Sequence, residues 1–430
     1  MLNQVINILW IVAIVLLLGG GIYFSIKLKF PQLKFLSLFS GLKNTGESAV
    51  SPFKSLTVSL AARIGVGSLS GIALAIYIGG PGTIFWIWII GIITSINAFS
   101  ETYLGLCYQK ESNGEYIGGP YFYILKGLKS KKLACIYAIL VILAYVIGFM
   151  TIQANTIVIS INNFFNVNVY AIAIILALIS AISIMKGMSR IVQITSKLVP
   201  LMGIGYIFLS VIILVKNIQL IPAVIGQIVS SALNFKAFGT GVLTSFIIGV
   251  QRGVFSTEAG LGTGSIATSS TYTKTKIEFS LSQILGIYFT VFVVCTSTAL
   301  IILTTPYRGL EFVGTNGIEL TQYALNYHLG NYGELTLVII VFCLAYSTIV
   351  AGYYYGESAL KFLITTINIK YLTLLRIITV FFILLGSLSL PTKLWTIIDI
   401  FVAILAIINM YSLIKFKNKI IYDYKKSKKM

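Results

Sequence analysis

The amino-acid sequence predicts an all-α polytopic membrane protein with about 11 transmembrane helices. Of its 430 residues, 57% are hydrophobic and 10% are charged, whereas soluble domains carry about 25% charged residues. Apolar segments of about 20 residues, the length that a helix needs to cross the hydrocarbon core, follow one another along the chain. No polar stretch between them is long enough for a separate soluble domain, so a lipid bilayer is the environment that fits this composition.

Eleven segments meet the length requirement for a membrane span. They lie near residues 4–26, 55–78, 82–108, 134–160, 168–186, 190–215, 238–270, 278–304, 334–366, 372–390 and 394–415. The first residues lack the basic start of a signal peptide, so the first segment is interpreted as a span. The second and seventh segments contain many glycines and polar residues, and we expect each of them to be interrupted.

The distribution of basic residues predicts the orientation in the membrane. With the N-terminus outside, the inner segments hold 25 of the 31 Lys and Arg residues. Basic loops face the cytoplasm, which predicts an outer N-terminus, a cytoplasmic C-terminus and an odd number of crossings. Two more basic residues, Arg63 and Arg252, fall inside spans. The remaining four are in outer segments: Lys216, Lys236, Arg308 and Lys393.

Charge and cysteine content argue against other classes of protein. The net charge of +19 comes from short segments between apolar runs and not from a basic face with its own fold, so nucleic-acid binding is not predicted. The four cysteines show no CxxC or Cys/His ligand spacing, which predicts neither a disulfide framework nor a metal centre. One histidine and 12 carboxylates, mostly in loops, offer almost no catalytic set for an enzyme. No organic cofactor is expected.

Two spans share an unusual pattern, in which an arginine is followed eight residues later by a glycine. The second span has Arg63 and Gly71, and the seventh has Arg252 and Gly260, with hydroxyl residues between them. The predicted topology places these spans five helices apart and in opposite directions. Glycine-interrupted segments at matching positions of two halves indicate an inverted-repeat transporter. We expect the interruptions at 64–68 and 253–258.

The helix ends at such interruptions suit charged ligands. Near Ser68, where the second span restarts, free N–H groups and the positive end of the helix dipole suit a substrate carboxylate. Near Ile64 and Gly65, where its first half ends, unpaired carbonyls suit a cation such as sodium. A second explanation is close helix packing through Gly67 and Gly71, which form a GxxxG pattern. No Lys-Ser/Thr follows these glycines and no βαβ unit surrounds them, so they do not indicate a nucleotide loop.

Ionisable residues inside the predicted spans point to function or to buried pairs. Arg63, Arg252 and Glu258 lie at depth, where a charge costs about 2.5–3.5 kcal/mol on insertion scales. We expect the two arginines to serve structure or gating rather than substrate contact. Snorkelling or an ion pair with Glu258 or Glu101 is the plainer explanation. His328 lies in a predicted outer loop and is given no role.

Polar residues on two further spans are candidate ligands. Gln153 in the fourth span can donate and accept, so it could hold the amino or the carboxylate group of a substrate, or it could form an ordinary interhelical bond. In the ninth span, Ala345, Ser347 and Thr348 offer hard oxygens for sodium. The alternative is that the two hydroxyls bond carbonyls of their own helix. The segment 118–123 is interpreted as a cytoplasmic interfacial turn.

Several motifs together resemble one known family. They are Gly71-Ile72-Ala73, Gly79-Gly80-Pro81-Gly82, Phe85-Trp86-Ile87-Trp88, Gly118-Gly119-Pro120-Tyr121-Phe122-Tyr123-Ile124, Lys197-Leu198-Val199-Pro200, Arg252-Gly253-Val254-Phe255-Ser256, Glu258-Ala259-Gly260 and Tyr354-Tyr355-Gly356-Glu357. They run along most of the chain, and as a set they are highly specific. The sequence resembles the alanine or glycine:cation symporters, the sodium:alanine symporters of bacteria and archaea.

The resemblance implies a LeuT-type fold, a 5+5 inverted repeat preceded by one extra helix. Residues 1–54 would then hold the extra N-terminal helix and a cytoplasmic loop. Residues 55–216 and 217–415 would form the two repeats, and 416–430 a basic cytoplasmic tail. The resemblance also implies that substrate and sodium meet between the two broken helices and the fourth and ninth spans.

The sequence departs from the family pattern at four positions. The family usually has Gly-Thr-Gly-Asn at the first interruption, where this chain has Val66 and Ser68 in place of Thr and Asn. It usually has Phe-Ser-Asn-Glu at the second, where Thr257 replaces Asn. A tryptophan usually follows the threonine of the ninth span by four positions, and Gly352 stands there. These changes remove polar contacts, and loss of the indole opens space beside the substrate side chain.

The leading hypothesis is sodium-coupled symport of a small neutral L-amino acid by alternating access across the bacterial plasma membrane. The expected substrate is alanine, glycine or a larger amino acid such as glutamine, and the expected coupling ion is sodium. The protein is expected to work as a monomer in the lipid bilayer. The rivals are a proton-coupled carrier of the same fold, a non-transporting sensor and a membrane-embedded enzyme. The expected substrate contacts are Val66, Gly67, Ser68, Gln153, Phe255, Ser256, Thr257, Thr348 and Gly352. The expected sodium ligands are Ile64, Gly65, Ala345, Ser347 and Thr348.

Overall fold

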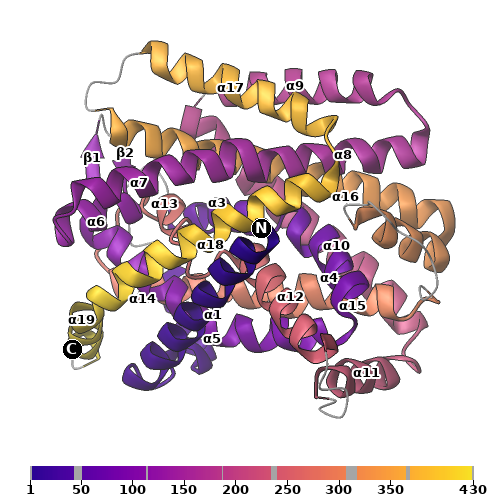
Figure 1. Ribbon diagram of the computed structural model, residues 1–430, viewed down its shortest axis with the longest axis horizontal. Helices are drawn as coiled ribbons and strands as arrows, with labels where there is room; N and C mark the ends of the chain where they lie inside the picture. The colour runs from indigo at the N-terminus through magenta and orange to yellow at the C-terminus, as the bar shows by residue number, and fades with distance from the viewer. Residues whose placement is uncertain are drawn as a thin grey trace.

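The apolar segments form helices, because a backbone surrounded by hydrocarbon has to satisfy its own N–H and C=O groups (Figure 1). The structure, a computed structural model, describes residues 2–42, 51–112, 115–185, 187–233, 240–306, 317–364 and 369–428. The helices up to residue 165 are α1 (Leu2–Lys27), η1 (Pro31–Leu33), α2 (Phe35–Leu38), η2 (Ser40–Leu42), α3 (Pro52–Arg63), η3 (Val66–Ser68), α4 (Ser70–Gly79), α5 (Gly82–Tyr108), α6 (Pro120–Gly127), α7 (Lys131–Ile142), η4 (Leu143–Phe149) and α8 (Met150–Phe165).

The remaining helices complete one continuous bundle. They are α9 (Val169–Met185), α10 (Gly187–Lys216), α11 (Ile221–Leu233), α12 (Thr240–Thr257), α13 (Gly264–Thr268), α14 (Lys276–Tyr288), η6 (Phe289–Cys295), α15 (Thr296–Leu303), α16 (Ile318–Leu363), α17 (Ile369–Ser387), α18 (Pro391–Lys415) and α19 (Lys417–Ser427). Helix α8 packs against α16 and α17, and α5 packs against α12 and α14. The strands of the described residues, β1 (Lys110–Ser112) and β2 (Glu115–Ile117), form one antiparallel pair.

The prediction of an all-α polytopic membrane protein is confirmed. Eight described helices are long and apolar enough to cross a membrane, and a ninth is counted if α3 and the segment from η3 to α4, bent by 59° at the break between them, are one span. At the expected span 168–186, α9 has 17 residues, or about 26 Å of helix, slightly less than the hydrocarbon core of ~30 Å. At the expected span 238–270, α12 stops at Thr257. The total of 11 crossings stays a prediction.

Two segments that the sequence assigns to a loop and a turn are helical. Helix α16 begins at Ile318, so His328 lies in a helix and not in a loop. Gly330, with φ 63° and ψ −154°, kinks that helix before the predicted ninth span begins. The predicted turn 118–123 contains the start of α6 at Pro120, a residue whose fixed φ suits a first helical position.

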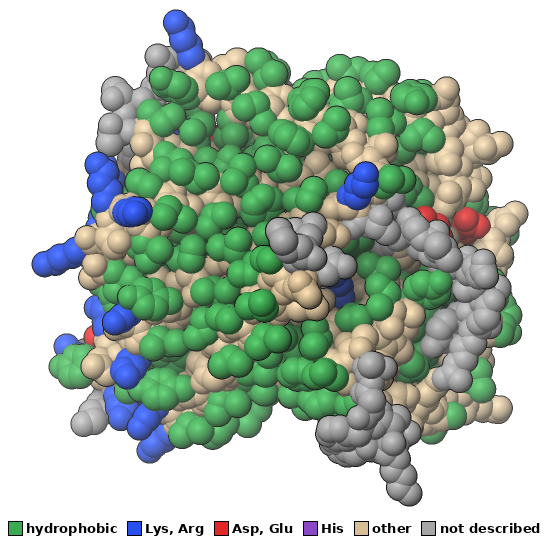
Figure 2. Space-filling view, viewed as in Figure 1, with side chains coloured by type: hydrophobic (Ala, Val, Ile, Leu, Met, Phe, Trp, Pro, Cys, Tyr) green, Lys and Arg blue, Asp and Glu red, His purple; other side chains and the backbone are tan. Residues whose placement is uncertain are grey.

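The surface separates apolar from basic side chains (Figure 2). A broad apolar face is flanked by Lys and Arg side chains at the edge where β1, α6 and α19 lie in Figure 1. Ile182, Ile204 and Ile377 are more than 60% exposed, as expected for side chains in contact with lipid. Which edge faces the cytoplasm stays a prediction. Five of the basic residues on which this prediction rests lie outside the described residues: Lys43, Lys186, Lys236, Arg308 and Lys429.

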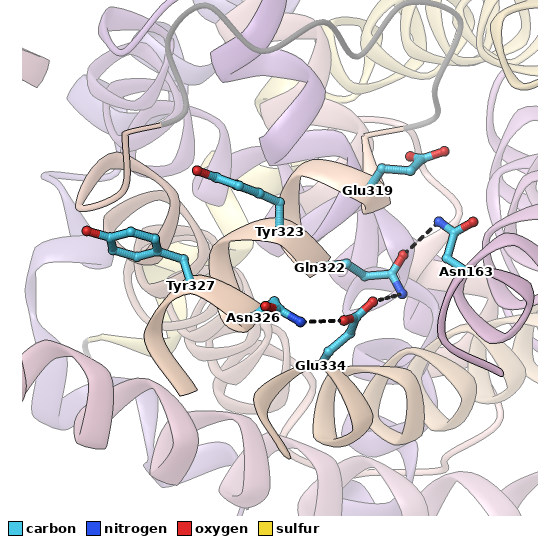
Figure 3. A pocket seen from close by; sticks show the side chains of 7 residues that line it. All are labelled: Asn163, Glu319, Gln322, Tyr323, Asn326, Tyr327 and Glu334. Carbon is cyan, nitrogen blue, oxygen red and sulfur yellow. Dashed lines mark hydrogen bonds between the residues drawn. The ribbon is translucent and has the colours of Figure 1, made fainter. Parts of the chain in front are cut away.

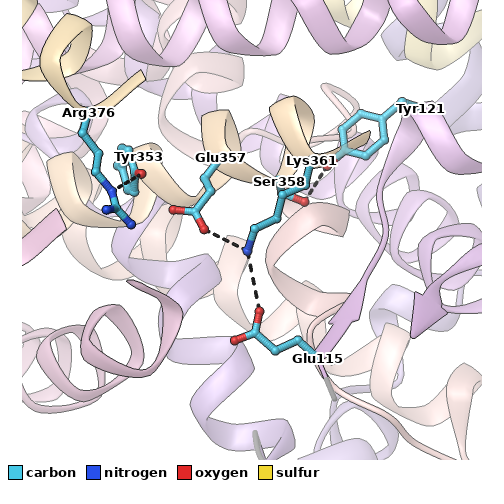
Figure 4. Close-up of polar contacts among 7 residues, drawn as sticks. All are labelled: Glu115, Tyr121, Tyr353, Glu357, Ser358, Lys361 and Arg376. Atoms are coloured by element: carbon cyan, nitrogen blue, oxygen red, sulfur yellow. Dashed lines mark hydrogen bonds and ion pairs between the residues drawn. The ribbon is translucent and has the colours of Figure 1, made fainter. Parts of the chain in front are cut away.

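A polar network joins elements at the basic edge (Figure 4). The ammonium of Lys361 lies 2.8 Å from a carboxylate oxygen of Glu357 in α16 and 3.7 Å from one of Glu115 in β2. The hydroxyls of Tyr121 in α6 and Ser358 in α16 are 2.7 Å apart. The network therefore ties the hairpin and α6 to the end of α16, and it brings together two family motifs that are distant in the sequence.

Candidate ligand-binding site between two interrupted helices

The first interruption lies between α3 and α4, with η3 as a single 3₁₀ turn between them. Gly65 has an extended backbone, with φ −111° and ψ −152°. A Cβ at this position would lie 2.5 Å from the hydroxyl oxygen of Thr348 and 3.1 Å from the side-chain amide of Gln153. The chain is therefore interrupted where the neighbouring helices leave room for backbone only.

Side chains from other helices bond the peptide groups that this interruption releases. The amide oxygen of Gln153 on α8 accepts the N–H of Val66 at 3.0 Å. The hydroxyl of Thr348 on α16 lies 2.7 Å from the carbonyl of Ala61 in α3, and 3.0 Å from the carbonyl of Leu344 in its own helix, so the shorter contact is the one to α3. The N–H and the hydroxyl of Ser68 both donate to the carbonyl three residues earlier, at 3.3 Å and 2.9 Å. A ligand carboxylate could bind the Ser68 N–H only by displacing this bond.

The second interruption lies further along the chain than the sequence predicts. Helix α12 continues to Thr257, and the chain then crosses residues 258–263 before α13 begins. Three residues there have positive φ: Glu258 at 54°, Gly260 at 88° and Gly262 at 91°. Glycines supply these left-handed conformations without a steric cost. Of the expected range 253–258, only Glu258 lies in the interruption, because α12 continues from Gly253 to Thr257.

A single carboxylate organises the second interruption. One oxygen of Glu101 on α5 accepts the N–H of Gly260 at 3.1 Å, the N–H of Gly262 at 2.9 Å and the side-chain amide of Asn409 on α18 at 3.0 Å. The Asn409 amide also donates to the Gly260 carbonyl at 2.9 Å. The hydroxyl of Tyr137 on α7 donates to the carbonyl of the residue between the two glycines.

The first interruption meets the last turn of α12, just before the second interruption, in the interior of the protein. A Cβ on Gly67 would lie 2.6 Å from the ring of Phe255 and 3.3 Å from the hydroxyl of Ser256. Ser256 is fully buried, and its hydroxyl has no hydrogen-bond partner among the described residues. The Phe255 ring stacks on Phe149 of η4 with centroids 4.7 Å apart, and its centroid lies 5.0 Å from that of Trp395. These contacts bring the expected residues of η3, α8, α12 and α16 to one buried place.

Four expected site residues show no such gathering of polar groups. The hydroxyls of Ser347 and Thr257 bond carbonyls of their own helices, at 2.8 Å and 2.9 Å. For Ser347, this bond is the alternative to sodium binding that the sequence left open. Ala345 lies three residues before Thr348 in α16 and is fully buried. Gly352 faces Tyr145, since a Cβ there would lie 3.2 Å from that ring.

Arg252 has a different ion-pair partner from the ones expected. Arg252 pairs with Asp399 of α18 at 2.6 Å, not with Glu101 or Glu258, and its guanidinium lies 4.5 Å from the centre of the Trp395 ring. Glu258 instead accepts the hydroxyl of Tyr145 at 2.6 Å. Asp399 and Trp395 both belong to α18, so this helix contacts α12 at Arg252 and Phe255.

Arg63 lies close to a carboxylate without a direct ion pair in the described residues. Its one guanidinium bond is a 3.4 Å contact to the carbonyl of Gln283, and its Nε and Nη2 have no hydrogen-bond partner among the described residues. The second oxygen of Glu101 also has no such partner. Both groups border Gly264, where a Cβ would lie 2.5 Å from Arg63 Nη2 and 3.5 Å from Glu101 Oε1.

Three groups that shape the site are not among the residues predicted from the sequence. Asn409 bonds the backbone of the second interruption, and Asp399 pairs with Arg252. The carbonyl of Ala61 faces the hydroxyl of Thr348. An amide and a carboxylate inside an apolar span were the available signals for the first two. Nothing in the sequence marks the carbonyl of an alanine.

A separate pocket of about 340 Å³ lies at the other end of α8 and α16 (Figure 3). It is lined by Asn163, Glu319, Gln322, Tyr323, Asn326, Tyr327 and Glu334. Glu334 accepts the amide of Asn326 at 2.8 Å and that of Gln322 at 3.4 Å. Asn163 is ten residues beyond Gln153 on α8, about 15 Å along a helix axis. None of the expected ligand residues lines this pocket.

We expect Gly264→Ala to destabilise the protein, because the new methyl group would enter the space that Arg63 and Glu101 border. Overpacking of this kind costs ~1–3 kcal/mol, so the midpoint of thermal unfolding should fall. Gly205→Ala in α10 is the control, since nothing lies within 4 Å of its Cβ position. Equal unfolding midpoints for the two variants would contradict the close approach at Gly264.

Sequence comparison identifies relatives along the entire chain. The Sodium:alanine symporter family matches residues 1–430. The amino-acid carrier protein AlsT of Bacillus subtilis is 35% identical over 99% of this chain and 93% of its own length. The probable sodium/glutamine symporter GlnT of the same organism is 33% identical, covering 98% and 90%. The sodium/alanine symporter AgcS of Methanococcus maripaludis is 32% identical, covering 96% and 93%.

Solved structures share the fold at low sequence identity. A mutant of a manganese transporter of Eremococcus coleocola superposes with a TM-score of 0.59 at 14% identity, covering 84% of this chain and 80% of its own. A Na⁺-coupled sialic acid symporter superposes with a TM-score of 0.54 at 13% identity, covering 90% and 82%. The LeuT-type fold implied by the sequence resemblance is thus confirmed, and the chain belongs to the sodium:alanine symporter family.

Proposed function

We propose that the protein is a secondary active transporter that moves a small neutral L-amino acid together with sodium by alternating access. The observation that carries this proposal is the meeting of two interrupted helices at Gly67 and Ser256, away from water. Half-helix ends at such a meeting point present peptide dipoles to both a carboxylate and a cation. The named activities of the relatives, sodium/alanine and probable sodium/glutamine symport, support this substrate class.

In this proposal the amino acid lies between η3 and α12. Its carboxylate faces the start of α4 at Gly67 and Ser68, and its ammonium takes the buried hydroxyl of Ser256 as an acceptor. Gln153 sets the shape of the turn through its bond to Val66. Phe255, Thr257, Thr348 and Gly352 complete the surroundings of the substrate.

Sodium binds between the end of α3 and α16 in the same proposal. The carbonyls of Ile64, Gly65 and Ala345 and the hydroxyls of Ser347 and Thr348 are the ligands carried over from the sequence. The Ala61 carbonyl joins them, because the Thr348 hydroxyl lies 2.7 Å from it. Such a group of uncharged oxygens is the donor set that hard cations prefer.

Gating residues flank the substrate on the α12 side. The pair Arg252–Asp399 and the ring of Trp395 cover Phe255, so they have to part when this side opens. Arg63 and Glu258 are assigned to the opposite side. The two repeats, 55–216 and 217–415, then rock against each other, in a monomer of the plasma membrane with its C-terminus in the cytoplasm.

The coupling is tested by uptake of labelled alanine and glutamine into proteoliposomes. An inward sodium gradient should drive accumulation, and its dissipation should abolish it. Uptake that follows a proton gradient in sodium-free buffer would select the proton-coupled carrier. Binding without uptake would select the non-transporting sensor, and either result overturns the proposal.

Thr348→Val should raise the sodium concentration for half-maximal uptake about tenfold, because a buried oxygen ligand is lost and the Ala61 carbonyl loses its donor. Thr379→Val is the matched control: Thr379 is also buried, but the one described group that its hydroxyl bonds is the carbonyl of Leu375 in its own helix, at 2.8 Å. An equal change in both variants would rule out the sodium site at Thr348.

Gly352→Trp should narrow the range of substrates. The indole would occupy the space against Tyr145 and Met150, whose atoms lie 3.2 Å and 3.5 Å from the Cβ position. Uptake of glutamine relative to alanine should fall about tenfold. Gly205→Trp, a lipid-exposed control, should leave that ratio unchanged. Unchanged glutamine uptake by active Gly352→Trp protein would show that this position does not line the substrate site.

A further inference from the structure

The C-terminal helix α19 presents one buried and one basic face. Ile420 and Tyr424 are 0% and 5% exposed, and the Tyr424 ring lies 5.8 Å from that of Phe99 in α5. This packing fixes the orientation of the helix on the protein. The exposed lysines on and beside α19 are Lys415, Lys417, Lys419, Lys425, Lys426 and Lys428.

The acidic residue of this helix does not neutralise the basic face. Asp423 accepts the hydroxyl of Tyr103 at 2.6 Å and the ammonium of Lys419 at 3.1 Å. Its charge is therefore paired toward the protein. Within the described part of the chain, the other lysines of α19 form no ion pair, and they lie along the basic edge that Figure 2 shows beside α19.

Exposed apolar side chains lie on the segment that follows α1, the helix beside which α19 begins. The ammonium of Lys417 lies 5.8 Å from the ring centre of Tyr23, so α19 begins beside the last turns of α1. The chain that leaves α1 carries Lys29 and Lys34, both exposed. It also exposes four apolar side chains: Leu33 at 64%, Phe35 at 55%, Leu36 at 89% and Phe39 at 48%.

We propose that these two segments, residues 29–39 and α19, form a binding surface for an anionic phospholipid. Lysines attract the phosphate of an anionic leaflet, and apolar side chains beside them enter the boundary between head groups and acyl chains. A soluble anion or a nucleic acid would use the lysines but would leave the apolar side chains exposed to water. The inference concerns the membrane environment of the protein and does not depend on its transport activity.

The test is thermal unfolding of the purified full-length protein with added phosphatidylglycerol or phosphatidylcholine. Phosphatidylglycerol should raise the unfolding midpoint, since a ligand of the native state stabilises it, and phosphatidylcholine should not. The variant K417Q/K425Q/K426Q/K428Q should bind phosphatidylglycerol at least about tenfold more weakly. Leu36→Ser, at a side chain that packing does not need, should also weaken binding without changing the midpoint in phosphatidylcholine.

The matched control is K110Q/K129Q/K131Q/K132Q, which removes the same charge from exposed lysines on other segments. It should retain the phosphatidylglycerol effect. If both quadruple variants lost phosphatidylglycerol binding equally, the effect would depend on overall charge alone, and the proposed site would be ruled out. A similar rise in the midpoint with glycerol 3-phosphate would indicate a site for free phosphate, and one with a single-stranded oligonucleotide would indicate a nucleic-acid surface; either result overturns the lipid assignment.

Discussion

Peptide groups that are released inside a membrane need partners that lipid does not supply, and the architecture of this protein depends on how that need is met. At the second interruption, Glu101 and Asn409 bind the N–H and C=O groups of the glycine segment. At the first, Gln153 and Thr348 do so from α8 and α16. The conformation of each interrupted helix is therefore set largely by side chains of its neighbours, and a movement of α5, α8, α16 or α18 acts directly on the site.

Aromatic and charged contacts join the site to the helices that surround it. Phe149, Phe255 and Trp395 form a continuous series of rings, and Trp395 also lies under the guanidinium of Arg252. This series links η4, α12 and α18. The π-helical geometry of η4 presents Phe149 to this series from within an otherwise regular helix. Packing and electrostatics therefore act on the same few residues at the centre of the protein.

The sequence was sufficient for the fold class and for the first interruption, since apolar length, glycine content and the family motifs all bear on backbone geometry. It misplaced the second interruption, because Gly253 and Gly260 look alike in a sequence and only tertiary contacts decide which one leaves the helix. It gave Arg252 the wrong partner, because Asp399 is remote along the chain. The helix before Gly330 was missed, since its polar residues lack the apolar length of a span.

The dependence of Gly260 on two different helices has an evolutionary consequence. Glu101 and Asn409 contact each other as well as the same glycine segment, so a change at one leaves the other with an unmatched buried group. Substitution at either position is tolerable only with compensation at its counterpart. Among homologues, the two positions are expected to vary as a pair, and a lineage that has lost both should also have reshaped the loop between α12 and α13.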